Sequence, residues 1–191
     1  PAVMAEFAQL FPGVELVVHE DTTAHLLKLA HAYEIDFALV SRPIEEARLE
    51  VKELFAEELL LALPPGHALA RKRTVTFADL AGERLIVMKA GHCLGDQVLG
   101  FCERRDVKPK ISFRSAQLET VQALVASGMG ISLIPAMAAQ TDRQESPKYC
   151  SLPSPKPQRK IVVAWPKQRP PGRAANEFLK LVAAPLQQPR H

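Results

Sequence analysis

"SAQLETVQALVASGMGISLIP", residues 115–135, combines a helical pattern with a buried strand and decides the fold. Its apolar residues recur three or four positions apart, which places them on one face of a helix: Leu118, Val121, Leu124 and Val125. Gly128 or Gly130 is expected to end that helix. The run "ISLIP" (131–135) that follows is short and apolar throughout, as in a strand buried on both faces.

The same alternation of helix and strand extends outward through most of the chain. Strands are predicted at 14–20, 35–40, 58–63, 85–88, 110–113 and 160–165, and further helices at 22–35, 76–83, around residue 93 and at 174–186. In the helix at 22–35, capped by Thr22 or Thr23, the expected inward side chains are Leu26, Leu27, Ala30 and Tyr33. This order predicts an α/β fold with parallel sheets covered by helices. The proline-rich connector at 153–158, followed by one more strand and helix, predicts two lobes, with the chain returning to the first.

Composition excludes several classes of function. The 191 residues carry a formal net charge of only +3, one Trp and two Tyr, which offers no nucleic-acid face or base-stacking platform. The densest basic cluster, "ARKR" (70–73), is interpreted as a solvated loop. No apolar run reaches the roughly 18 residues of a membrane span. Without a signal-peptide pattern, and with only three cysteines, the chain is expected to be cytoplasmic, with no membrane partner.

Motifs for metal and cofactor chemistry are missing from the sequence. There is no CxxC or HExxH, so no metal site is predicted. There is no P-loop, no GxGxxG and no GxSxG, so we expect no nucleotide cofactor and no serine hydrolase.

Two of the three cysteines lie nine positions apart in "GHCLGDQVLGFC", residues 91–102. On one α-helix, nine residues advance about 13.5 Å and place Cys93 and Cys102 on opposite sides. A disulfide needs Cα atoms within roughly 7 Å, so the pair cannot bond while the helix stands. Either these are two unrelated core cysteines, or the segment refolds when they join. Cys150 has no partner by spacing and is interpreted as an incidental loop residue.

Three features favour a reactive Cys93 over a small apolar core residue. His92 and Lys89 are close enough in sequence to stabilise a thiolate. Cys93 stands at the expected start of a helix, where the dipole favours an anion. Gly95 and Gly100 each weaken the helix by about 1 kcal/mol relative to Ala, as suits a helix that must open. Replacing Gly95 by Ala is therefore expected to slow disulfide formation.

Most of the chain resembles the effector domain of LysR-type transcriptional regulators, through "LFPGVELVVHEDTTAHLLKLAHAYEIDFALV", "PPGHALA", "TFADLAGERLIVM" and "QLETVQALVASGMGISLIPAMA". The segment "GHCLGDQVLGFC" resembles the redox motif of the peroxide-sensing OxyR family within that group. The resemblance implies two periplasmic-binding-protein-like lobes, the type 2 periplasmic binding fold. Lobe I is expected to comprise residues 1–56 and 162–191, with its first strand upstream of Pro1, and lobe II residues 57–161 and both motif cysteines.

The resemblance also implies a chemistry. Hydrogen peroxide would oxidise Cys93, and Cys102 would be its disulfide partner, with His92, Thr23 and Asp96 near the reactive thiol. The chain would be a regulator and not an enzyme, forming a homodimer through this domain and a tetramer when full-length. DNA would be bound only by an N-terminal helix-turn-helix that the chain lacks, and a thiol reductant such as glutaredoxin or thioredoxin would reset the sensor.

Three positions depart from the best-known family member, which has histidine, arginine and a bulky basic residue where this chain has Ser112, Lys160 and Gly95. The main alternative function is a LysR effector domain that binds a small organic ligand between its lobes without redox chemistry. The cleft would then be lined by Thr22, Thr23, Ser41 and Gln117. A solute-binding protein and a thiol peroxidase are further alternatives. Only the motif of the two cysteines separates the redox sensor from the ligand-binding LysR domain, and it favours the sensor. A solute-binding protein should carry a secretion signal, and the chain has no second active-site signature of the kind expected in a peroxidase.

Overall fold

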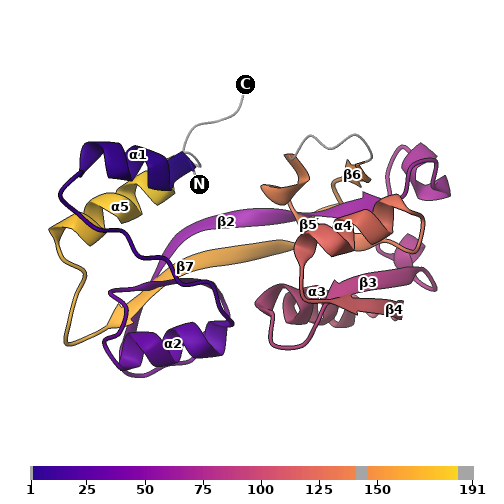
Figure 1. Ribbon diagram of the computed structural model, residues 1–191. Helices are drawn as coiled ribbons and strands as arrows, with labels where there is room; N and C mark the ends of the chain where they lie inside the picture. Colours follow the sequence, from indigo (N-terminus) through magenta and orange to yellow (C-terminus); the bar gives the residue numbers. More distant parts are fainter. Residues whose placement is uncertain (1, 141–145, 185–191) are drawn as a thin grey trace. The chain divides into compact units, whose positions relative to one another are not determined.

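The computed structural model describes residues 2–140 and 146–184, which form two compact units. Unit 1 contains the described residues up to Phe55 and from Lys160 onward, and unit 2 contains Ala56–Arg159. Two long strands, β2 (Leu49–Leu63) and β7 (Gln158–Pro166), carry the chain from one unit into the other (Figure 1). Unit 2 is therefore continuous in sequence, whereas unit 1 is assembled from two distant segments.

Unit 1 packs helices against a short antiparallel ladder. Its helices are α1 (Ala2–Leu10), α2 (Thr23–His31) and α5 (Arg173–Ala183). Strand β1 (Ala38–Ser41) pairs antiparallel with β7. Helix α1, which the sequence analysis did not predict, lies beside α5, where the rings of Phe7 and Phe178 meet edge to face at 5.3 Å (Figure 1). The apolar core of this unit comprises Leu27, Ala30, Ala38, Val40, Leu49, Val162 and Ala164.

Helix α2 begins as the sequence predicts but ends earlier. Thr22 is its N-cap, and the hydroxyl of Thr22 accepts a hydrogen bond from the backbone N–H of His25 at 3.4 Å. The predicted end at residue 35 is wrong, because the chain leaves the helix at Tyr33, whose φ is 60°. The N–H groups of Tyr33 and Glu34 bond back to Ala30 and Leu29, which closes the helix in a Schellman motif. Tyr33 is exposed and does not face the core, contrary to the prediction.

The predicted strand at 14–20 is also wrong. This segment has no regular structure, and the side chains of Val17 and Val18 are 66% and 58% exposed. No described strand pairs with it, so its backbone has no ladder of hydrogen bonds to hold it extended. The strand was predicted from apolar composition alone, but a strand also needs a neighbouring strand, and none is present within the described residues.

Unit 2 contains both parallel and antiparallel pairs. Strand β3 (Arg84–Met88) pairs in parallel with β4 (Lys110–Ser115), and one parallel bridge joins Leu85 to Ile131. Strand β2 pairs antiparallel with β5 (Ser132–Pro135) and with β6 (Lys148–Cys150). The prediction of parallel sheets is thus correct for β3 and β4, where a helix forms the crossover. It is wrong for the other named strand pairs.

Two helices cover these strands. Helix α3 (Cys93–Arg104) connects β3 to β4, and α4 (Leu118–Ala126) connects β4 to β5 (Figure 1). Val121 and Val125 of α4 are buried, and Gly128, at φ 80°, ends α4 as predicted. The described part of unit 2 also contains the 3-10 turns η1 (Ala68–Arg71), η2 (Ala78–Leu80) and η3 (Ala138–Gln140). The turn η2 replaces the longer helix predicted at 76–83.

In residues 2–140 and 146–184, no helix is both long enough and apolar enough to cross a membrane.

Candidate functional site

Helix α3 carries the two cysteines of the motif, and the connection from β3 fixes where the helix begins. The N–H of Lys89 donates to the carbonyl of Ser115 on the neighbouring strand at 2.7 Å. Gly91 then adopts φ 90°, a conformation that glycine reaches without strain. His92 follows as the N-cap in an extended conformation, and Cys93 is the first residue of the helix. His92 makes no side-chain capping bond, so its imidazole is not engaged in holding the helix.

The two thiols have different environments on the same helix. Cys93 is half-buried at the N-terminus, whereas Cys102 is only 3% exposed and belongs to the apolar core of unit 2. Both are free thiols. Nine helical residues separate them by about 13.5 Å along the axis, well beyond the roughly 7 Å that a disulfide allows between Cα atoms. The predicted helix across the motif is confirmed, and a bond between these cysteines requires α3 to open.

Burial sets the protonation of Cys102. Removal from water raises the pKa of the Cys102 thiol above its ordinary value, and the Glu103 carboxylate raises it further. The carbonyl of Cys102 also accepts from the N–H of Val107 at 2.9 Å, and Asp106 between them has φ 51°. This Schellman closure ends α3. Cys102 is therefore a protonated thiol held in the last turns of a well-terminated helix.

Close packing, and not only weak helix propensity, accounts for Gly95. Gly95 is buried, and a Cβ at this position would lie 2.5 Å from the carbonyl oxygen of Met88, the last residue of β3. The interpretation of Gly95 as a helix-weakening residue therefore missed its main role, which is to let α3 contact the strand backbone. At Gly100 the nearest atom to an added Cβ is Nη1 of Arg104, at 3.3 Å, on a side chain that can move. The original interpretation still suits Gly100.

The C-terminal end of α3 is held by a cation–π cluster. The guanidinium of Arg105 lies 4.4 Å from the ring centroid of Phe77 and 5.7 Å from that of Phe101. The two rings meet edge to face at 5.3 Å. Arg105 also donates to the carbonyl of Pro155 at 2.9 Å. We call Arg105, Phe77, Phe101 and Pro155 the Arg105 clamp, because these contacts join the end of α3 to two other segments of unit 2.

The clamp was not predicted from the sequence, although one signal for it was present. Phe101 and Arg105 are four residues apart, a spacing that brings side chains together on a helix. Nothing in the spacing identifies Phe77 or Pro155 as their partners.

The structure places the other predicted site residues in two groups. His92, Cys93 and Asp96 occupy the first turn of α3 in unit 2, with Asp96 exposed. Thr23 is the first residue of α2 and belongs to unit 1. The residues predicted to line a ligand cleft also belong to different units. Gln117 is in unit 2, and unit 1 contains Thr22, Thr23 and Ser41.

The two remaining departures from the family pattern make polar contacts. Ser112 donates to the carbonyl of Leu85 at 3.4 Å. Lys160 pairs with Glu53 at 3.0 Å.

Cys150 differs from its predicted place in a loop. It is the last residue of strand β6 and lines a pocket. Burial raises the pKa of the Cys150 thiol, and the positive charge of Lys148 acts in the opposite direction. Among the described residues, no three histidine, cysteine or acidic side chains gather where they could hold a metal ion.

Comparison with known proteins agrees with this architecture. The DNA-binding transcriptional dual regulator OxyR of Escherichia coli K12 is 36% identical over 167 residues, which is 86% of this chain and 54% of that protein. The chain thus spans about half the length of the curated relatives it matches. The reduced OxyR regulatory domain from Pseudomonas aeruginosa superposes with a TM-score of 0.83 at 26% identity, covering 95% of this chain and 88% of that one.

An oxidised form of OxyR superposes with a TM-score of 0.81 at 31% identity, covering 96% of this chain and 87% of that one. The fold is therefore that of LysR-type regulatory domains, which resemble periplasmic binding proteins. Residues 1–187 match the family described as the LysR substrate binding domain, and the chain belongs to this family.

Proposed function

We propose that this chain is the hydrogen-peroxide-sensing domain of a LysR-type transcriptional regulator, in which Cys93 and Cys102 form a reversible disulfide. Units 1 and 2 would be the two lobes of the sensor. The observation that carries the proposal is the position of the two thiols: one accessible at the start of α3, the other buried nine residues later. The relatives named as hydrogen peroxide-inducible genes activators support the choice of oxidant.

Oxidation begins at Cys93. Its thiolate attacks one oxygen of hydrogen peroxide, forming an S–O bond while the O–O bond breaks, and the departing hydroxide takes up a proton to become water. Cys93 is the first residue of α3, and the N-terminus of a helix is in general a favourable place for a negative charge. His92, the N-cap residue directly before Cys93, would orient the peroxide, and Asp96 stands three positions further along α3.

Cys102 completes the switch only after α3 opens. The Cys102 sulfur then attacks the Cys93 sulfenic acid, forming the S–S bond while the S–O bond breaks and water leaves. Burial slows this step in two ways. It keeps the Cys102 sulfur away from Cys93, and it raises the pKa of the Cys102 thiol, so that less of the reactive thiolate is present. The disulfide holds the segment in its refolded state until a reductant of the glutaredoxin or thioredoxin class restores both thiols.

In the full-length regulator, this rearrangement would change how the regulatory domains of a dimer, or of a tetramer, contact one another. DNA would be bound by a domain outside this chain, so the redox change would be transmitted to it through the shifted subunits. The activity of the sensing domain is therefore a conformational signal, without turnover of peroxide as a substrate.

Thiol counting with peptide mapping tests the proposal. One equivalent of hydrogen peroxide added to the reduced chain should consume two of the three thiols and yield a peptide cross-linked between Cys93 and Cys102, with Cys150 still free. Dithiothreitol should restore all three. A Cys150→Ser variant should behave identically. A cross-link to Cys150, or a chain that keeps three thiols under conditions that oxidise a known sensor, would contradict the assignment.

A further inference from the structure

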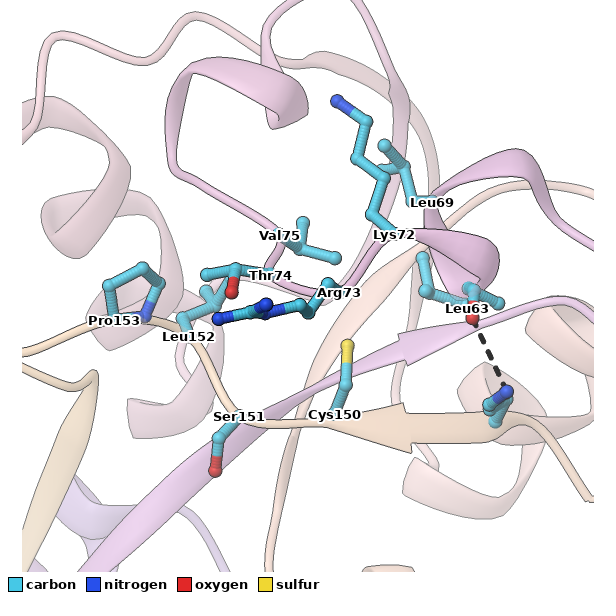
Figure 2. A pocket seen from close by; sticks show the side chains of 12 residues that line it. Leu63, Leu69, Lys72, Arg73, Thr74, Val75, Cys150, Ser151, Leu152 and Pro153 are labelled. Carbon is cyan, nitrogen blue, oxygen red and sulfur yellow. Dashed lines mark hydrogen bonds between the residues drawn. The ribbon is translucent and has the colours of Figure 1, made fainter.

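Unit 2 contains a small pocket that is separate from the cysteine helix. It has a volume of about 270 Å³ and lies between strand β6 and the segment that follows η1 (Figure 2). The residues that line it are Leu63, Leu69, Ala70, Lys72, Arg73, Thr74, Val75, Lys148, Cys150, Ser151, Leu152 and Pro153. The peroxide chemistry proposed above uses none of them.

The floor of this pocket is apolar, whereas its rim is positively charged. Its apolar surface is presented by three half-buried residues, Ala70, Cys150 and Pro153. Four almost fully buried side chains complete the floor: Leu63, Leu69, Val75 and Leu152. The rim contributes three cationic side chains, Lys72, Arg73 and Lys148, and none of the described residues that line the pocket is acidic. A small molecule with an apolar body and a negative charge would match both surfaces.

The three cations are not equally available. Lys72 is paired with Asp79 at 2.6 Å, and Lys148 donates to the carbonyl of Ala70 at 3.3 Å, the dashed line in Figure 2. Arg73 makes no ion pair or hydrogen bond to any residue in the described part of the chain. Its exposed guanidinium therefore retains all its donors, in the planar arrangement that binds a carboxylate with two parallel hydrogen bonds.

We propose that this pocket binds a small organic carboxylate with an apolar body, whose carboxylate pairs with Arg73 and whose apolar part covers the floor. The volume lies just below the range of about 300–1,000 Å³ that is usual for small-molecule sites, so the ligand is a small one. Lys148 adds a second positive charge near the carboxylate. This function is independent of the peroxide chemistry at Cys93.

Cys150 provides a natural reporter for the pocket. Its sulfur points from β6 toward the loop that carries Arg73 (Figure 2). A ligand seated on the floor should therefore shield this thiol. Alkylation of the reduced chain by iodoacetamide, followed site by site with peptide mass spectrometry, measures the shielding at Cys150 while Cys93 serves as an internal reference.

The test uses phenylacetate as the probe and phenylacetamide as its neutral counterpart. Phenylacetate should slow alkylation of Cys150 but not of Cys93, and phenylacetamide should have little effect. Arg73→Gln should weaken protection by phenylacetate about ten-fold, since a charge-assisted hydrogen bond is lost. The matched control is Arg71→Gln, because Arg71 is also exposed but does not line the pocket; it should retain full protection.

Three results would overturn the proposal: no protection by phenylacetate, equal protection by the neutral amide, or unchanged protection in Arg73→Gln. Equal protection by inorganic phosphate would also overturn it, since the apolar floor would then play no part. Isothermal titration of phenylacetate into the same three proteins gives an independent reading that does not depend on thiol reactivity.

Discussion

Cys93 and Cys102 share a helix but would react in a fixed order, because only one of them is accessible. Replacement of Cys102 by Ser removes the second thiol and leaves the first turn of α3 unchanged. We expect Cys93 in this variant still to be oxidised to the sulfenic acid, and the acid to persist because its partner is missing. Trapping with dimedone and mass spectrometry should detect an adduct on Cys93. Its absence, in a chain shown to be folded by circular dichroism, would remove Cys93 from the mechanism.

Gly95 and Gly100 offer a matched pair of substitutions with opposite expected effects. A methyl group at Gly95 meets the Met88 carbonyl, so Gly95→Ala should push α3 from β3 and cost about 1–3 kcal/mol of reduced-state stability. Disulfide formation should then become roughly ten-fold faster. At Gly100 the added methyl requires only a small shift of the flexible Arg104 side chain, so Gly100→Ala should stabilise the helix by up to about 1 kcal/mol and slow the same step up to about five-fold.

Stopped-flow measurement of both variants after peroxide addition separates the two steps. Only the second phase, disulfide formation, should change, because the sulfenic acid forms while the helix is intact. If both variants slow the second phase, helix propensity outweighs packing at Gly95, and the close contact with Met88 has no kinetic consequence.

For single residues, the sequence predicted the positions of the reactive cysteines, but it did not predict which atoms each residue contacts in the fold. The spacing of Cys93 and Cys102 predicts their separation on a helix from geometry alone, and the helix is confirmed. The role of Gly95 was not predictable, because it depends on a strand carbonyl that approaches only after folding. A glycine in a sequence has the same low helix propensity whatever its neighbour in space turns out to be.

We expect the Arg105 clamp to hold the C-terminal end of α3 closed. Arg105→Ala removes the contacts with two rings and one carbonyl, which together stabilise the helix end by about 1–3 kcal/mol. Disulfide formation should accelerate five-fold or more by the usual relation of about 1.4 kcal/mol per ten-fold. Arg104→Ala is the control, since Arg104 is exposed and makes no such contact with the rings. Equal acceleration by both substitutions would assign the effect to lost helix charge and not to the clamp.

Elements were predictable where periodicity and a stop signal coincided. Helix α4 has both a regular apolar face and a stop signal at Gly128, and it forms and ends as the sequence predicts. The segment at 14–20 has apolar residues but no partner strand among the described residues, and a strand cannot be predicted without the strand that it pairs with. Helix α1 was not predicted, because its apolar residue Phe7 is buried against a residue far away in the sequence, Phe178 of α5.

A buried ion pair joins the two long strands at the ends of unit 2. Glu57 of β2 is 4% exposed and accepts hydrogen bonds from Arg159 of β7 at 2.6 Å and from the N–H of Met137 at 2.7 Å. Arg159→Ala would leave this carboxylate buried without its cation, and we expect a loss of about 3–5 kcal/mol in the free energy of unfolding. Urea denaturation followed by circular dichroism measures it.

The adjacent residue supplies the comparison for this prediction. Lys160 also pairs with a β2 carboxylate, Glu53, but both side chains are largely exposed, at 55% and 42%. Lys160→Ala should therefore cost less than about 1 kcal/mol. Similar losses in the two variants would show that burial does not distinguish these pairs.

The order in which the two units are synthesised follows from where the chain crosses between them. It enters unit 2 at Phe55/Ala56 and leaves it at Arg159/Lys160. A nascent chain that has left the ribosome as far as Arg159 contains every residue of unit 2, which can then acquire its core, including Cys102. Unit 1 still lacks α5 and most of β7, so Phe7 has no contact with Phe178, and β1 has no strand to pair with, until those two segments have emerged. The half that holds both motif thiols can therefore mature first, and the apolar surfaces at the start of this domain are the ones that remain open to chaperones for longest.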